Sequence, residues 1–488
     1  MRKTYFLFAF FAIAATFLVR NNPFFWDTVQ LASKHGHFFF DTHFSSLILP
    51  EEIDSGHIPT FGLYMALCWE IFGKTLAVSH FAMLPFLLSI GYFLLKIGSF
   101  LAGEKKAAWL LFICFADPVL MSQSLLVSPD VVLVCFLLMG LYAVWIKKTD
   151  GLLMLAVIGL GLTSMRGMMV AIGLFVFSFA AIPTNVKSNG AVQSISAGQV
   201  AVFFRKLIPF LPGGIMAACY LFYHWQQTGW IGHHAGSPWA PSFERVGFQG
   251  FIKNIAVFGW RMLDFGRVFT FLAALFFVKE IFRKGAFVKR PLLKELLLLV
   301  LIILVTTIPT QLMYSGLLAH RYFLPLFICL HLLLFFLLFE SSKPLNFGLS
   351  SKWLAGLVIV GLFTGNLWVY PKKISQGWDS TMAHLPWYDL IGTAQQYLKG
   401  EEIPFEQVGT AFPNIGPREW YELDGRLEGF VEKDFKKDCF ILYSNIMNDF
   451  SDEEIDELET NWQPVYHQER MGVCLIIYKN PEFKECGN

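Results

Sequence analysis

The stretch that decides the fold is residues 321–339, RYFLPLFICLHLLLFFLLF, in which Arg321 is the only charged side chain. As a helix it would be about 28 Å long, close to the roughly 30 Å of hydrocarbon in a bilayer. The whole chain agrees, because 55% of its 488 residues are hydrophobic and only 15% are charged, against about 25% charged in a soluble domain. The sequence therefore indicates an integral membrane protein, and its net charge of +1 argues against a nucleic-acid binder.

Eleven apolar runs are long enough to be predicted as membrane-spanning helices. They are residues 4–19, 76–101, 107–126, 130–146, 151–164, 167–183, 206–225, 266–282, 293–311, 321–339 and 352–370. The fifth and sixth runs are parts of one apolar stretch that Met165-Arg166-Gly167 interrupts. We expect an all-α polytopic membrane bundle of about 11 transmembrane helices.

Charge divides the chain near residue 370. Residues 1–370 contain 27 Lys and Arg against 15 Asp and Glu, whereas residues 371–488 contain 11 against 22. We predict a transmembrane domain over 1–370 and an acidic extracytoplasmic α/β domain over 371–488. Its predicted elements are helices at 384–399 and 451–459 and strands near 405–410, 439–444 and 472–478.

Basic residues favour the cytoplasmic side of a membrane. With the N-terminus inside, the predicted inner loops hold 16 basic and three acidic residues, and an odd number of spans places the tail outside. The outer face then has two long loops, 20–75 and 226–265. The apolar stretch 57–75 contains Glu70, and counting it as a span would invert every later loop, so we predict an amphipathic helix on the outer surface.

The N-terminus and the cysteines indicate the compartment. Residues 1–19 are predicted to be a retained span, because Arg20-Asn21-Asn22 offers no small-residue cleavage site. We expect a bacterial inner membrane with the acidic domain in the periplasm. Cys439 and Cys474 lie on two predicted strands, and either a disulfide between them or two free thiols fits their spacing. The sequence contains no CxxC, HExxH, GxxxxGK[ST] or dinucleotide-binding glycine motif.

Three aspartates are candidates for chemistry. Asp27, in Phe24-Phe25-Trp26-Asp27, follows the first span on the predicted outer side, and Asp130, in Ser128-Pro129-Asp130, begins the fourth span. Each could be a general base or, alternatively, a helix cap. Asp117 precedes Pro118 inside a span, where a helix break could direct its carboxylate toward a cavity.

Basic and aromatic side chains gather on the same predicted face. Arg166 interrupts one apolar stretch, and His320-Arg321-Tyr322 opens the tenth span. Arginine is the side chain best shaped to bind a phosphate with two parallel hydrogen bonds, although interfacial arginines also occur without function. His233-His234 in the second outer loop have no spaced partner for a metal. Carboxylates and arginines at one membrane surface suit an enzyme that takes a sugar from a lipid phosphate.

The order of these residues resembles the polytopic glycosyltransferases of the C superfamily, in the branch of protein O-mannosyltransferases and lipid A aminoarabinose transferases. Trp26-Asp27 is similar to the family's catalytic aspartate of the first outer loop. Residues 54–59 (DSGHIP) with the amphipathic stretch 63–73 resemble its His-Pro-Pro-Leu segment. Ser128-Pro129-Asp130 resembles the aspartate of its second outer loop, and Arg321-Tyr322 the pair that begins a late span.

The resemblance implies a helical bundle with an outer cavity and a sugar on a polyprenyl phosphate as donor. Asp27 would be the base, Asp130 would position the first outer loop or a metal, and His57 would line the acceptor's entrance. The lipid phosphate would be held by Arg166 and Arg321, with His320 and Tyr322 beside them. It leaves a divalent cation, the sugar, the acceptor and the oligomeric state open. Two residues depart from the family pattern. Ile58 replaces the first Pro of the segment, which argues against assignment to a named subfamily, and His80 stands where members often have Arg, which shifts the phosphate contacts to Arg166 and Arg321.

Two other classes remain open on the sequence alone. A transporter or flippase of a lipid-linked sugar would also need arginines and buried carboxylates, but the sequence shows none of the inverted repeats typical of many transporters. A non-catalytic envelope scaffold would use the acidic domain for binding and would make Asp27 and Asp130 dispensable.

Overall fold

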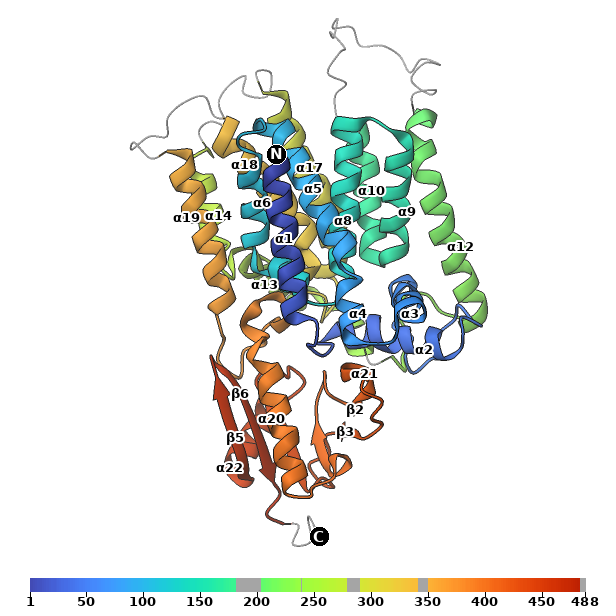
Figure 1. The fold of residues 1–488 in the computed structure, drawn as a ribbon, viewed down its shortest axis with the longest axis vertical. Helices are drawn as coiled ribbons and strands as arrows, with labels where there is room; N and C mark the ends of the chain where they lie inside the picture. Colours follow the sequence, from blue (N-terminus) through green and yellow to red (C-terminus); the bar gives the residue numbers. More distant parts are fainter. Residues whose placement is uncertain (181–202, 238, 279–289, 341–349, 483–488) are drawn as a thin grey trace, which may run out of the picture.

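A computed structural model describes residues 1–180, 203–237, 239–278, 290–340 and 350–482. Long helices run side by side in one bundle, and a small sheet follows them in the chain. The N-terminus lies at one end of the bundle and the sheet beyond the other end (Figure 1). The expected class, a largely helical apolar bundle with a small C-terminal α/β unit, is confirmed at this level.

The bundle helices follow the apolar runs closely. They are α1 (Arg2–Val19), α4 (Leu76–Phe81) continued by α5 (Leu84–Ala102), α6 (Ala107–Ala116), α7 (Pro118–Leu125), α8 (Pro129–Tyr142), α9 (Asp150–Thr163), α10 (Met165–Ala180), α12 (Leu211–Thr228), α14 (Val268–Leu275), α17 (Pro291–Leu312), α18 (Leu324–Glu340) and α19 (Ser351–Thr364). Parts of two predicted runs, 181–183 and 279–282, lie outside the described residues.

Six helices of the described residues are long and apolar enough to cross a membrane, and the bent pair α6–α7 could be a seventh. Helices α9, α10 and α19 are apolar but shorter. Large apolar side chains such as Phe10, Phe11 and Leu18 are exposed, as expected for surfaces that face lipid. The predicted number of eleven spans therefore stays a prediction.

The run predicted at 107–126 is not straight. Helices α6 and α7 meet at Asp117 with a bend of 76°, because Pro118 cannot continue the helical hydrogen bonds of α6. Asp117 caps α7 by accepting a hydrogen bond from the amide of Val119 at 2.9 Å. The bend turns α7 toward the end of the bundle where the sheet lies.

The first outer loop contains short helices at this same end (Figure 1). They are η1 (Val29–Lys34), α2 (His35–Asp41) and α3 (Thr60–Phe72). Helix α3 has 13 residues, with Ile71 and Phe72 exposed and Met65 and Trp69 buried. Its length and its place at the end of the bundle agree with the amphipathic helix predicted for this stretch.

The C-terminal unit is a six-stranded sheet in the order β2-β3-β1-β4-β6-β5. Its strands are β1 (Val408–Thr410), β2 (Gly416–Pro417), β3 (Gly429–Glu432), β4 (Phe440–Ser444), β5 (Gln463–Arg470) and β6 (Val473–Lys479). Strand β1 pairs in parallel with β3 and β4, and the other pairs are antiparallel. Helices α20 (Pro386–Gly400), α21 (Glu419–Glu422) and α22 (Asp452–Asn461) complete the unit.

The predicted helices and three of the strands of this unit are present, whereas β2, β3 and β5 were not predicted. Both alternatives for Cys439 and Cys474 are wrong, since the two residues neither bond to each other nor are both free thiols. Cys439 is disulfide-bonded, but Cys474 is a free thiol buried in the sheet. The inward direction of Cys474 on β6 explains this, because its side chain packs with the apolar core of the unit.

Candidate active site

Asp27 lies just beyond α1 on a short segment that leads into η1. Trp26 has the positive φ of 54°, which is rare for a bulky residue and turns the chain at this point. The hydroxyl of Thr28 accepts a hydrogen bond from the amide of Phe25 at 2.8 Å and donates to its carbonyl at 2.7 Å, so Thr28 satisfies the backbone here. The Asp27 carboxylate is free to point into the molecule, where it is 8% exposed and bonds to Arg321.

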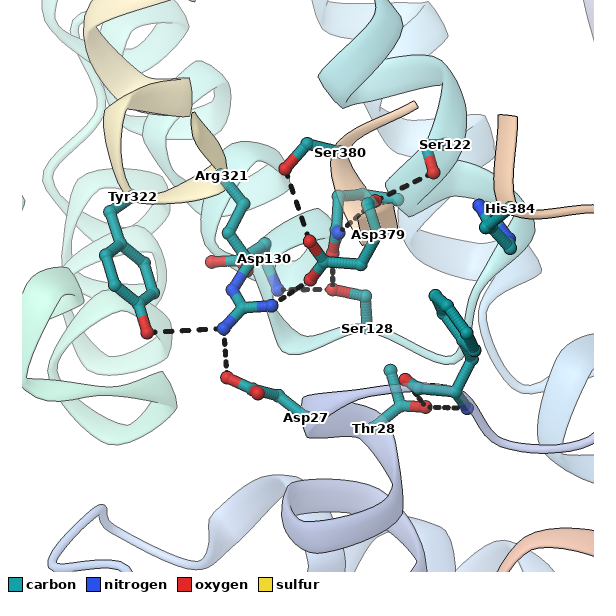
Figure 2. Close-up of polar contacts among 12 residues, drawn as sticks. Asp27, Thr28, Ser122, Ser128, Asp130, Arg321, Tyr322, Asp379, Ser380 and His384 are labelled. Carbon is teal, nitrogen blue, oxygen red and sulfur yellow. Dashed lines mark hydrogen bonds and ion pairs between the residues drawn. The ribbon is translucent and has the colours of Figure 1, made fainter. Parts of the chain in front are cut away.

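Arg321 is the centre of the cluster shown in Figure 2. It lies on the short turn η5 (His320–Phe323) before α18, and it is 4% exposed. Its two terminal nitrogens form ion pairs with Asp27 and with Asp379, and its Nε lies 3.8 Å from Asp130. One terminal nitrogen also donates to the Tyr322 hydroxyl at 3.2 Å.

Asp130 is the third carboxylate, at the first turn of α8. The helix cap is Ser128, whose hydroxyl accepts from the Asp130 amide at 3.1 Å. The Asp130 side chain is therefore available for Arg166, at 2.7 Å. Arg166, at the start of α10, also stacks on the Tyr322 ring, with its guanidinium carbon 4.5 Å from the ring centroid.

Asp379 was missed by the sequence analysis. It lies on η7 (Trp378–Ser380), the turn that leads from the bundle to the C-terminal sheet, and is 3% exposed. No motif marks it, but one signal was available: Trp378-Asp379 repeats the dipeptide Trp26-Asp27. The cluster thus brings together residues from the first outer loop, the bundle and the C-terminal unit.

Burial controls the charge of this cluster. Three carboxylates and two arginines leave one excess negative charge when all are ionised. Burial raises the pKa of Asp27 to about 6, and the neighbouring Asp130 adds to this effect, while Arg321 opposes it. A carboxyl with such a pKa is ionised at neutral pH and is a stronger base than an exposed aspartate.

His57 lies beside the cluster without joining the ion pairs. A small pocket is lined by His57 and His35 together with Asp130 and Arg166. Burial and the charge of Arg166 lower the pKa of His57 to about 4, so its ring is neutral. Its buried Nδ1 has no hydrogen-bond partner among the described residues, so it can bind a group that enters the pocket.

The other predicted residues lie outside the cluster. His320 points away from it and bonds to Asp264 at 2.8 Å. His234 contacts Glu51 at 3.2 Å, and His233 stacks on Phe243. Within the described ranges, no group of three or more His, Cys, Asp or Glu side chains could hold a metal ion.

Asp117, the third candidate aspartate, is engaged by buried side chains of the bundle. Its carboxylate forms two hydrogen bonds with Arg267, at 2.9 and 3.0 Å, and a third with His331 at 3.0 Å. All three residues are at most 1% exposed. The Asp117 carboxylate is thus fully paired at the bend between α6 and α7.

An apolar groove lies close to the cluster, between α13 (Phe248–Leu263) and α17. Its volume is about 740 Å³, and Arg245 is the only charged residue among the described residues that line it. Phe258 in its wall packs against Phe323, with ring centroids 5.2 Å apart. Phe323 is two residues from Arg321, so the groove approaches the cluster.

These features define a multi-pass membrane protein in which a helical bundle, the loop after α1 and a C-terminal sheet unit meet at a buried carboxylate–arginine cluster. No protein-family model matches the sequence, and no curated protein matches it. Among solved structures, the chain is similar to the crystal structure of ArnT from Cupriavidus metallidurans in the apo state. The identity is 13%, the TM-score is 0.49, and the match covers 96% of this chain and 97% of that chain.

Proposed function

We propose that the chain is an integral membrane glycosyltransferase that moves a sugar from a polyprenyl-phosphate donor to an extracytoplasmic acceptor. One observation carries this proposal. Asp27, Asp130 and Asp379 converge on Arg321, with Arg166 beside them, at the end of the bundle where the outer loops and the sheet meet. Such a site offers both a base and cations for a phosphate leaving group.

The transfer reaction uses the charged side chains of the cluster in different roles. The acceptor's hydroxyl oxygen forms a bond with the anomeric carbon of the sugar, and its proton passes to the Asp27 carboxylate. The bond between the anomeric carbon and the phosphate oxygen breaks, and the electron pair stays on the phosphate. Arg321 and Arg166 stabilise the negative charge that develops there. Asp130 holds Arg166 in place at 2.7 Å.

The neutral His57 and the Tyr322 hydroxyl suit the uncharged parts of the substrates. His57 lines the small pocket beside Asp130 and Arg166, where it can hydrogen-bond a hydroxyl of the acceptor or of the sugar. Tyr322 supports both arginines, by a hydrogen bond to Arg321 and by stacking on Arg166. His320 supports the turn that presents Arg321, through its bond to Asp264.

The groove between α13 and α17 suits the lipid part of the donor. Its lining is almost entirely apolar, and its wall contacts the turn that carries Arg321. An isoprenoid chain in this groove would place its phosphate near the two arginines. The donor would then be loaded sideways from the bilayer.

A divalent cation has no evident place in this site. The donor set does not fit one, because the three carboxylates of the cluster are engaged by Arg321 and Arg166. We therefore assign no step to a metal ion. We propose that the N-terminus is cytoplasmic and that the cluster and the acidic domain face the periplasm of an inner membrane, as the distribution of basic residues predicts.

One observation favours a second function, the transport of a lipid-linked sugar. Broken helices are frequent in transporters, and α6 and α7 are bent by 76° at a buried Asp117–Arg267–His331 group. The Asp117 carboxylate at the bend is fully paired with Arg267 and His331, however, which suits a structural role. The glycosyltransferase remains the better-supported function.

The test is sugar transfer in liposomes from a panel of radiolabelled polyprenyl-phosphate sugars. We expect wild type to release polyprenyl phosphate and Asp27→Asn to release none. The matched control is Asp389→Asn, because Asp389 forms an exposed ion pair with Arg470 in the C-terminal unit. Labelled lipid that crosses the bilayer without cleavage would support the transporter instead, and full turnover by Asp27→Asn would remove Asp27 from the role of base.

A further inference from the structure

Each nitrogen of the Arg321 guanidinium already faces a partner. A phosphate is bound best by two adjacent N–H groups of a guanidinium. One terminal nitrogen of Arg321 is paired with Asp379, and the other with Asp27 and the Tyr322 hydroxyl, while Nε faces Asp130. A phosphate can therefore reach Arg321 with two bonds only if a carboxylate gives up its place.

Among the three carboxylates, Asp379 is the one best suited to be displaced from Arg321 by a phosphate. Asp27 is needed next to the acceptor, and Asp130 already has a closer partner in Arg166 at 2.7 Å. The other oxygen of Asp379 accepts a hydrogen bond from the Ser380 hydroxyl at 3.2 Å, so this carboxylate keeps a partner when it leaves Arg321 (Figure 2).

The backbone of Asp379 is fixed while its side chain is the part that can move. Its carbonyl accepts hydrogen bonds from Ser122 at 2.7 Å and from the Gln123 side chain at 2.9 Å, both on α7. The same Gln123 side chain accepts from Ser128, which caps α8 next to Asp130. These hydrogen bonds from α7 thus fix the position of the Asp379 backbone relative to Arg321 and Asp130.

We propose that Asp379 is a specificity-determining residue that competes with the donor's phosphate for Arg321. The segment between the bundle and the C-terminal sheet then sets the affinity of the site for polyprenyl phosphate. The inference rests on the proposed function, because it takes a lipid phosphate as the ligand. The competition also has a use after transfer, since the returning Asp379 carboxylate helps to release the more strongly charged phosphate product.

Charge gives the direction of the effect. With three ionised carboxylates and two arginines, the cluster carries one excess negative charge, which opposes an anionic lipid. Replacing Asp379 by Asn removes that excess and leaves Arg321 with two carboxylate partners, Asp27 and Asp130. Polyprenyl phosphate should therefore bind more tightly to the variant, in which two carboxylates still balance the two arginines.

The experiment measures the dissociation constant of polyprenyl phosphate in detergent micelles for wild type, Asp379→Asn and Asp389→Asn. We expect Asp379→Asn to bind at least about tenfold more tightly, with a larger rise in melting temperature on adding the lipid, and Asp389→Asn to match wild type. Asp379→Ser, which also removes the charge, is a second variant in case the amide does not fold.

The outcomes separate this inference from the proposed function. Unchanged or weaker binding by the folded Asp379 variants, with clear binding by wild type, would overturn the competition and leave the glycosyltransferase standing. No binding by wild type or by any variant would contradict both. Tighter binding by Asp389→Asn as well would mean that general surface charge, and not Arg321, is responsible, and would also overturn the inference.

Discussion

Replacing Asp27 by Asn should abolish sugar transfer and yet make the folded protein more stable at neutral pH. The reason is that burial holds the pKa of Asp27 at about 6, above its ordinary value of 3.8. At pH 7.5 the folded state must keep this carboxylate ionised at a cost that the unfolded chain does not have. An uncharged amide of the same shape avoids that cost.

The magnitude follows from the pKa shift. A rise of roughly two units at about 1.36 kcal/mol per unit corresponds to about 3 kcal/mol at pH 7.5. The sign follows from proton binding. The folded wild type binds the proton more readily than the unfolded chain, so its stability falls as pH rises from about 4 through 6. By the same linkage the advantage of Asp27→Asn should shrink to roughly half of this at pH 5.

The assay is thermal unfolding of purified wild type and Asp27→Asn in detergent at pH 7.5 and pH 5, with transfer measured on the same preparations. We expect the variant to melt a few degrees higher at pH 7.5, by a smaller margin at pH 5, and to have no transfer. The reasoning is refuted if the variant melts lower than wild type at pH 7.5, because the ion pair with Arg321 would then outweigh the cost of burial.

Three further predictions concern other groups. The transfer rate should fall about tenfold per pH unit below pH 6 and level off above it, because Asp27 must be ionised; a rate that is flat between pH 5 and 8 would contradict this. Arg166→Gln should lower kcat/KM for the donor by about 10- to 100-fold, measured by steady-state kinetics, because one hydrogen bond to a charged group contributes about 1.5–3 kcal/mol. Arg267→Met should destabilise the bundle by about 3–5 kcal/mol, because it leaves Asp117 buried without its cation. Adding Asp117→Asn to Arg267→Met should recover part of the loss in melting temperature. If Arg267→Met alone were as stable as wild type, the Asp117–Arg267 ion pair would not be needed for stability.

The bundle could be predicted from the sequence because a helix that crosses a membrane presents apolar side chains to lipid or to neighbouring helices along its whole length. Each such helix therefore appears in the sequence as a long apolar run. The sequence also indicated the break at Asp117, since Pro118 follows it. The strands β2 and β5 were harder to predict from the sequence. Strand β2 has two residues, and most of β5 is exposed, so neither carries the alternating apolar pattern that marks a half-buried strand.

The candidate site was predictable in part. Residues near the ends of spans on one predicted face, such as Asp27, Asp130 and Arg321, could be expected to lie near one another. Asp379 could not, because its approach to Arg321 depends on hydrogen bonds from Ser122 and Gln123 that only the folded chain brings together. The direction of His320 also depends on a tertiary contact, because its ring bonds to Asp264 outside the cluster.

The most direct test of the central claim is to count the polyprenyl phosphate released from a labelled polyprenyl-phosphate sugar by wild type in liposomes, with Asp27→Asn beside it. The carboxylate–arginine cluster predicts one polyprenyl phosphate for each sugar transferred by wild type, and none from the variant although it still binds the lipid. Equal release by both proteins, or intact donor in the presence of every acceptor fraction offered, would contradict the account.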